Sequence, residues 1–318
     1  MRTFIQDFDD IEGGKHARQL HYLLPIMLPA LLEAFTCEEA GVRGRERILS
    51  LFYNLIRLIT WADGIDNELV DKCLQDDFHQ WMALFLQIIQ SSPKQNFNVK
   101  KNALKCLTVI FRDLINFSKD NINMILKPAW KLLNSHMPIF TEVLAYNNPI
   151  PLAEGEELDE EEDQDHDDSS LGEDGEMSGI EGMTFALLEL LSTLVLRPNV
   201  QSLVTQGLLP LLTSVSSYLL LQRRHERIYR GDPTFFIADN SQDLLKIETI
   251  RSQCLVLISS LIEVFGDVAT QGVLIIIDKL FQKSDIKQQI QIEEETKSAV
   301  KQDNDKSDEE EGERKIND

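Results

Sequence analysis

Apolar residues recur at steps of three and four along most of this chain, and no other feature constrains its fold as strongly. The spacing is typical of helices that bury one face. It falls on Met183, Leu187, Leu190 and Leu194 in one run, and on Ile48, Leu51, Leu55 and Leu58 in another. Runs with the alternating period of a strand, bounded by hairpin turns, are not evident. The sequence therefore predicts an all-α protein.

The expected helices cover most of the first 282 residues. They span residues 17–36, 43–62, 68–90 with a break near Asp76 and Asp77, 97–117, 120–146, 180–196, 200–221, 243–265 and 267–282. Short connections favour the pairing of consecutive helices into antiparallel hairpins.

Three of these helices carry a proline inside an apolar stretch, at Pro29, Pro128 and Pro210. A proline inside a helix removes a backbone hydrogen bond and kinks it, so its recurrence indicates one architectural unit used several times. The spacing after removal of residues 147–178 is close to that of HEAT repeats. We predict a HEAT-repeat α-solenoid, a right-handed superhelix of helical hairpins, over residues 1–285. A globular helical bundle is the alternative.

Residues 154–176 contain 14 carboxylates and no Lys or Arg, although apolar helical segments flank them on both sides. Without these charges the formal net charge of -22 becomes -8, and residues 293–318 account for a further -6. The predicted helical frame is therefore nearly neutral. We expect residues 147–178 to form an acidic disordered loop inserted in the solenoid, and residues 286–318 to form a charged, disordered tail.

A dense run of carboxylates attracts clustered Lys and Arg and repels nucleic acid and anionic membranes. The predicted partner is a basic protein, with no direct contact to nucleic acid. A solubilising linker is the other interpretation of the same segment. The predicted contact residues are Asp159, Glu160, Glu161, Glu162, Asp163, Asp165, Asp167, Asp168, Glu173, Asp174 and Glu176.

Motifs that would indicate an enzyme are not found. The chain has no nucleotide-binding glycine loop, no zinc-protease motif and no nucleophile elbow. Its six histidines are scattered, and its four cysteines are far apart and lie mostly in apolar helical patterns, as expected of reduced structural thiols. We expect no catalytic activity, no cofactor and no metal. The longest uncharged apolar run, residues 22–32, is too short to cross a bilayer, so no membrane insertion is expected.

An ordered set of short segments between about residues 75 and 282 resembles the importin-β family of nuclear transport receptors. The set consists of Pro128 and Trp130 in a kinked helix, the acidic residues 173–176, Gly179 and Phe185 opening an apolar helix, and Asp232, Pro233, Phe236, Asp239 and Arg251 further on. Full receptors of this family are several times longer than 318 residues, so the resemblance covers a segment of one.

The resemblance implies a HEAT superhelix that carries basic nuclear proteins, such as histones and ribosomal proteins, between cytoplasm and nucleus. It also implies binding of the GTPase Ran and of nucleoporins when the rest of the receptor is present. Two functions of other classes stay open. One is a HEAT scaffold of a larger complex that uses its helical ridges, and the other is an acidic histone chaperone without a transport role.

Overall fold

The computed structural model describes residues 17–61, 67–92, 94, 96–114, 121–145, 179–219, 229–234 and 249–282. The chain divides into two compact units, Met1–Gly266 and Asp267–Asp318, which we treat separately. Every regular element in the described ranges is helical, so the prediction of an all-α protein is confirmed.

The first unit contains helices of three kinds. They are the α-helices α2 (Ala17–Thr36), α3 (Gly41–Trp61), α4 (Asn67–Gln90), α5 (Phe97–Asp113), α7 (Ile122–Phe140), α8 (Gly179–Val195), α9 (Pro198–Thr205), α10 (Leu208–Ser217) and α13 (Ile250–Phe265), the 3-10 turn η1 (Glu38–Ala40), and the π-helical turn η2 (Thr141–Ala145).

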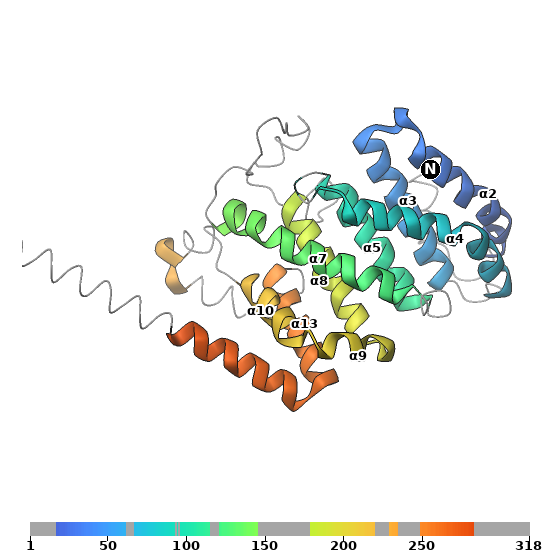
Figure 1. Cartoon of the computed structure of the whole chain (residues 1–318). Coiled ribbons are helices and arrows are strands. Elements are labelled where there is room, and N and C mark those ends of the chain that lie inside the picture. The colour runs from blue at the N-terminus through green and yellow to red at the C-terminus, as the bar shows by residue number, and fades with distance from the viewer. Residues whose placement is uncertain are drawn as a thin grey trace, which may run out of the picture. The chain divides into compact units, whose positions relative to one another are not determined.

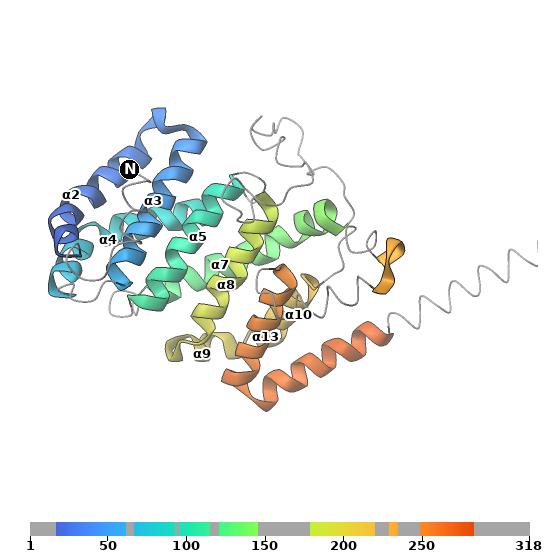
Figure 2. The same cartoon turned by 180° about the vertical axis from the view of Figure 1, so that it is seen from behind.

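The α-helices of this unit pack in two layers (Figures 1 and 2). In the first layer α2 packs on α4, α4 on α7, and α7 on α10. In the second layer α3 packs on α5, α5 on α8, and α8 on α13. Consecutive helices join the layers, because α2 packs on α3, α4 on α5, α7 on α8, and α10 on α13. The chain thus alternates between layers as it advances, apart from the short helix α9.

The prolines follow this alternation. Pro25 and Pro29 lie in α2, Pro128 and Pro138 in α7, and Pro210 in α10. All three helices belong to the first layer, whereas the second-layer helices contain no proline. A helix that lacks one internal hydrogen bond can bend around its neighbours, and here such helices share one side of the stack.

Aromatic residues join the first two hairpins. The ring of Phe52 on α3 lies 4.2 Å from that of Trp81 on α4 and 5.7 Å from that of Phe85, measured between centroids. All three side chains are at most 2% exposed. Burial of such rings contributes about 1.5–3 kcal/mol each, which makes this cluster a principal stabilising contact of the region.

Three of the expected helices differ from those observed. Helix α5 ends at Asp113, with Leu114 as its C-cap, and not at residue 117. Helix α4 runs without the break expected near Asp76 and Asp77. Two aspartates lower helix propensity by less than about 1 kcal/mol each, and the burial of Phe78, Trp81 and Phe85 beyond them outweighs that cost.

The single helix expected over residues 200–221 is instead two, α9 and α10, separated at Gln206 and Gly207. A Cβ atom built on Gly207 would lie 2.1 Å from Cη2 of Trp130 on α7. Because glycine has no Cβ atom, the turn can approach the indole ring closely at this position, and the helix is interrupted there.

The described part of the second unit is one helix, residues 267–282, which matches the expected range. Large apolar side chains remain exposed along it: Val268, Leu274, Ile275, Ile277, Leu280 and Phe281.

Candidate functional site

The structure places none of the acidic residues predicted to bind a basic partner. Asp159 to Asp168 and Glu173 to Glu176 all fall between Ala145 and Gly179, outside the described residues. The predicted tail from residue 286 onward also lies outside the described residues. Their role in binding stays a prediction. The structure does describe the two points at which the acidic segment leaves and rejoins the helices, and the surfaces around them.

The segment leaves from the end of α7. There the last turn widens into the π-helical turn η2, and Oγ1 of Thr141 donates a hydrogen bond to the Met137 carbonyl at 2.9 Å. Phe140 and Val143 are buried on either side of this bond. The chain is therefore packed against the protein as far as Val143, two residues before the described part ends at Ala145.

The segment rejoins the helices at Gly179, which begins α8. Its φ of +57° lies in the left-handed region that favours glycine, and its N–H donates to Oδ1 of Asn98 at 2.9 Å. Asn98 belongs to α5, the neighbour of α8 in the second layer. Glu181, only 6% exposed, follows in the first turn of α8, where a carboxylate interacts favourably with the helix dipole.

A fully buried bond joins the two helices that flank the segment. Oγ1 of Thr184 on α8 donates to the Ile180 carbonyl at 2.7 Å, so its single proton is used within its own helix. Nε2 of His136 on α7 lies 2.9 Å from the same oxygen, within hydrogen-bond distance. This contact fixes α7 against the first turns of α8.

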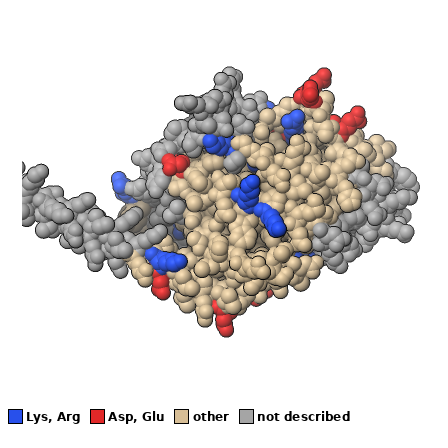
Figure 3. Space-filling model, viewed as in Figure 1, with Lys and Arg blue, Asp and Glu red and all other residues tan. Residues whose placement is uncertain are grey.

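The two layers differ in charge. On the first layer, α10 has no charged residue, α7 has only Lys127 and Lys131, and α2 and α4 together contain five acidic residues and two basic ones. Figure 3, which views the side of α4, α7 and α10, shows few charged side chains on an otherwise uncharged surface. On the second layer, α3 and α5 together contain eight basic residues and two acidic ones. The acidic pair is Glu46 and Asp113; the basic residues are Arg43, Arg45, Arg47, Arg57, Lys100, Lys101, Lys105 and Arg112.

Several of these cations are ordered by their neighbours. The guanidinium carbon of Arg57 lies 5.7 Å from the ring centroid of Tyr53, and Nζ of Lys105 lies 5.8 Å from it. Nζ of the buried Lys100 donates to the Ser92 carbonyl just beyond the end of α4, where the helix dipole favours a cation. The nearly neutral frame deduced from the sequence thus has a basic region on α3 and α5.

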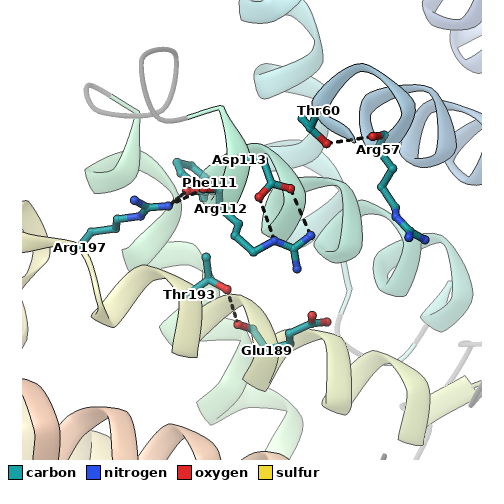
Figure 4. Close-up of polar contacts among 8 residues, drawn as sticks. All are labelled: Arg57, Thr60, Phe111, Arg112, Asp113, Glu189, Thr193 and Arg197. Atoms are coloured by element: carbon teal, nitrogen blue, oxygen red, sulfur yellow. Dashed lines mark hydrogen bonds and ion pairs between the residues drawn. The ribbon is translucent and has the colours of Figure 1, made fainter. Parts of the chain in front are cut away.

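Polar contacts on α5 and α8 lie beside this region (Figure 4). The bonds drawn between elements are those of Arg197 to α5, and the others stay within a single helix. The guanidinium of Arg112 pairs with the carboxylate of Asp113 at 3.1 and 3.2 Å, which raises the pKa of Arg112. Burial raises the pKa of Glu189 on α8, and the positive charges of Arg112 and Lys105 oppose that effect. Arg197, after α8, donates to the carbonyls of Phe111 and Arg112 and so caps the end of α5.

The cysteines for which side chains are described behave as the sequence predicts at two of three positions. Burial raises the pKa of Cys254 to about 12 and raises that of Cys106 as well, so both are inert thiols of the core. Cys37 is free and exposed. Within the described ranges, no three His, Cys, Asp or Glu side chains are placed to hold a metal ion.

No single described helix is both long and apolar enough to span a bilayer. Helices α8 and α9 reach that length and composition only when taken together, and they meet at a bend of 105°.

Comparison with known protein families finds no family model that matches this chain.

The basic region on α3 and α5 was missed in the sequence, although Arg43, Arg45 and Arg47 stand at alternate positions there. Sequence alone did not show that α5 would lie beside α3 and add its own lysines.

Proposed function

We propose that this chain is a segment of a nuclear transport receptor of the importin-β type, most like importin-9 within that family. In this proposal the helices form a right-handed HEAT-repeat solenoid, and the acidic segment captures basic cargo such as histones or ribosomal proteins. Ran and nucleoporins are partners of the receptor as a whole, which works in cytoplasm and nucleus. The protein is a carrier without catalytic activity or cofactor.

The alternation of layers supports the solenoid. Each hairpin packs on the hairpin before it and the one after it, within both layers. The first helices of successive hairpins begin at residues 17, 67, 122 and 208. After residues 146–178 are set aside, these starting points lie roughly 50 to 55 residues apart, a little above the ~40 to 47 residues of HEAT-type repeats.

The observation that carries the binding proposal is where the acidic segment is inserted. It connects α7 and α8, the two helices of one hairpin, whose ends are fixed by the His136–Thr184 and Gly179–Asn98 bonds. Fourteen carboxylates are therefore tethered at both ends to a packed frame. Tethering keeps them at high local concentration beside any basic protein that meets the frame.

The charge of the described surface favours the same assignment. A basic protein is repelled by the Lys and Arg of α3 and α5, and the first-layer helices α2 and α4 together offer it only five carboxylates. The 14 carboxylates of residues 154–176 are therefore the densest negative charge that this part of the chain can offer to a basic cargo.

The test compares three forms of the intact chain by fluorescence anisotropy with a labelled core histone dimer, across a series of salt concentrations. In the first variant all Asp and Glu of residues 154–176 become Asn and Gln. In the matched control the acidic residues of 293–318 are changed in the same way. We expect the first variant to lose at least about tenfold in affinity and most of its salt dependence, and the control to lose much less.

Equal binding by the wild type and the first variant would reject the acidic segment as the cargo contact and favour a scaffold that uses its helical ridges. Retained histone binding by a full receptor containing this segment, with no response to Ran-GTP or to nucleoporin repeats, would favour a histone chaperone.

A further inference from the structure

A cavity of about 310 Å³ lies within the first unit, where the ends of α2 and α4 meet the beginnings of α3 and α5. Its volume is within the range of sites that hold small ligands or single side chains, roughly 300–1,000 Å³. It lies on helices remote in sequence from the acidic segment. Its walls come from two successive hairpins, so the cavity exists only when these hairpins are packed together.

One wall is apolar. Phe35, Val42, Leu84, Ile88 and Val99 line it, from all four helices. Phe35, Ile88 and Val99 are otherwise buried in the core, with at most 9% of their surface exposed. A ligand that fills this space therefore removes apolar surface from water on several sides.

Arg45 is the single charged residue among those that line the cavity. Its guanidinium carbon lies 5.7 Å from the centroid of the Phe35 ring, which holds the group over an aromatic face. Its Nε is buried and has no hydrogen-bond partner among the described residues. Because this Nε is enclosed by the protein, an anion in the cavity would pair with the outer part of the guanidinium, whose positive charge strengthens a hydrogen bond to a carboxylate.

Asn96 adds a second polar group that its own helix does not use. It occupies the N-cap position of α5, where an asparagine side chain normally accepts a hydrogen bond from the helix, yet no such bond is present. Its φ of +57° is the only positive value at a non-glycine residue in the described ranges. At α13, by contrast, Thr249 does cap its helix, at 3.1 Å to the amide of Ser252. Asn96 is one of the residues that line the cavity.

We propose that this cavity binds a carboxylate attached to an apolar group, with Arg45 pairing the carboxylate, Asn96 supplying a further polar contact and the apolar wall covering the rest. A single planar guanidinium matches the two oxygens of one carboxylate. The more highly charged phosphate would call for additional cations that the lining lacks. The ligand is either the C-terminal residue of a peptide or a free organic acid, since both have this chemistry.

The experiment uses the intact chain and four probes in isothermal titration calorimetry. Two are 4-phenylbutyrate and its carboxamide; the others are acetyl-Ala-Ala-Leu with a free C-terminus and the same peptide as an amide. We expect at least one carboxylate to bind about tenfold or more tighter than its amide, as one charge-assisted contact provides. Binding by the peptide alone identifies a chain terminus as the ligand, and binding by 4-phenylbutyrate as well identifies organic acids in general.

Arg45→Gln should abolish the preference for the carboxylate, whereas Arg47→Gln, which removes the same charge from an exposed position outside the cavity, should leave it unchanged. Should Arg45→Gln fail to fold, methyl NMR of the wild type gives the answer, because whichever carboxylate probe binds must shift the methyl signals of Val42, Leu84 and Val99. Absence of binding by all four probes, equal affinity for acids and amides, or shifts confined to other methyl groups would overturn the proposal.

Discussion

The two layers of the first unit hold their helices together by different means. First-layer neighbours meet through aromatic residues: Tyr218 packs on Phe140 with 4.8 Å between ring centroids, and Trp130 lies against the backbone of Gly207. Second-layer neighbours are joined by polar side chains that bond to the next helix. Asn102 on α5 donates to the Glu46 carbonyl on α3 at 3.1 Å, and Asn98 accepts from the start of α8.

The difference concerns both stability and chemistry. The aromatic contacts between α7 and α10 gain from burial, and α10 has no charged residue, whereas α5 in the second layer carries four cations and one carboxylate beside its polar links. Tyr218 combines both roles, because its hydroxyl donates to the Leu133 carbonyl at 2.7 Å within the first layer. Basic residues are thus concentrated on α3 and α5 of the second layer, whereas α2 and α4 of the first layer carry more acidic than basic residues.

The largest effect is expected in the middle of the second layer. Leu187 on α8 is fully buried, and Leu187→Ala should lower the free energy of unfolding by about 2–5 kcal/mol through lost burial and a cavity. Leu203→Ala on α9, where the side chain is 41% exposed, should cost well under half as much. Urea denaturation monitored by circular dichroism measures both. Similar losses would mean that α8 is not the central helix that the packing indicates.

A smaller loss is expected from the contact between Trp130 and Gly207. Gly207→Ala places a methyl group in the space of the indole and should cost about 1–3 kcal/mol. Gly231→Ala, where a Cβ meets no atom within 4 Å, should change stability by less than about 0.5 kcal/mol. In a Trp130→Phe background the cost of Gly207→Ala should shrink. An unchanged cost in that background would show that the indole is not what excludes the methyl group.

Asparagine residues allow a direct comparison of polar contacts in the two layers. Asn98→Ala removes the acceptor of the Gly179 amide and should cost about 1 kcal/mol. Asn134→Ala on α7, whose Oδ1 accepts from the exposed Ser214 hydroxyl at 2.7 Å, should cost less than about 0.5 kcal/mol. Hydrogen exchange of the Gly179 amide should accelerate only in the first variant. Equal costs at the two positions would remove the proposed distinction between the layers.

The smallest effect concerns Glu189. Burial raises the pKa of this carboxyl in the folded protein, so the folded state binds its proton more tightly than the unfolded state does. Ionisation above the folded pKa therefore costs stability, and that cost disappears as the pH falls to the unfolded pKa, about 4.3. We expect Glu189→Gln to unfold at higher urea concentration than the wild type at neutral pH, with the gap narrowing as the pH is lowered. A less stable variant at neutral pH would show that the attraction to Arg112 and Lys105 outweighs burial.

Local patterns predicted the class of the fold and many helix boundaries. The expected limits of α2 are those observed, and the four residues predicted to form the buried face of α8 are all fully buried. On α3 the predicted face is confirmed at Leu55, which is buried, but is displaced at the start of the helix. Ile48 and Leu51 are only half-buried, whereas Leu49, Phe52 and Ile56 are in the core. That segment is apolar on more than one side, so periodicity alone does not select the face that packs.

The features that the sequence did not reveal all depend on residues distant in the chain. Gly207 meets Trp130 across 77 positions, and the cavity beside Arg45 needs Phe35 and Val99 from other helices. The acidic contact residues differ from these, because their prediction rests on charge density within one segment. Such a signal is local, and it identifies a chemistry without fixing any geometry.

The bond between Gly179 and Asn98 also affects how a pulling force on the acidic segment is distributed among the helices. If the acidic segment captures a client as proposed, a pulling force on the segment acts on its two attachment points, the end of α7 and the beginning of α8. At the beginning of α8 the force is shared with α5, because the Gly179 amide is held by the Asn98 side chain of α5. Tension from a captured client would thus spread sideways into the neighbouring hairpin before it could peel α8 from its place.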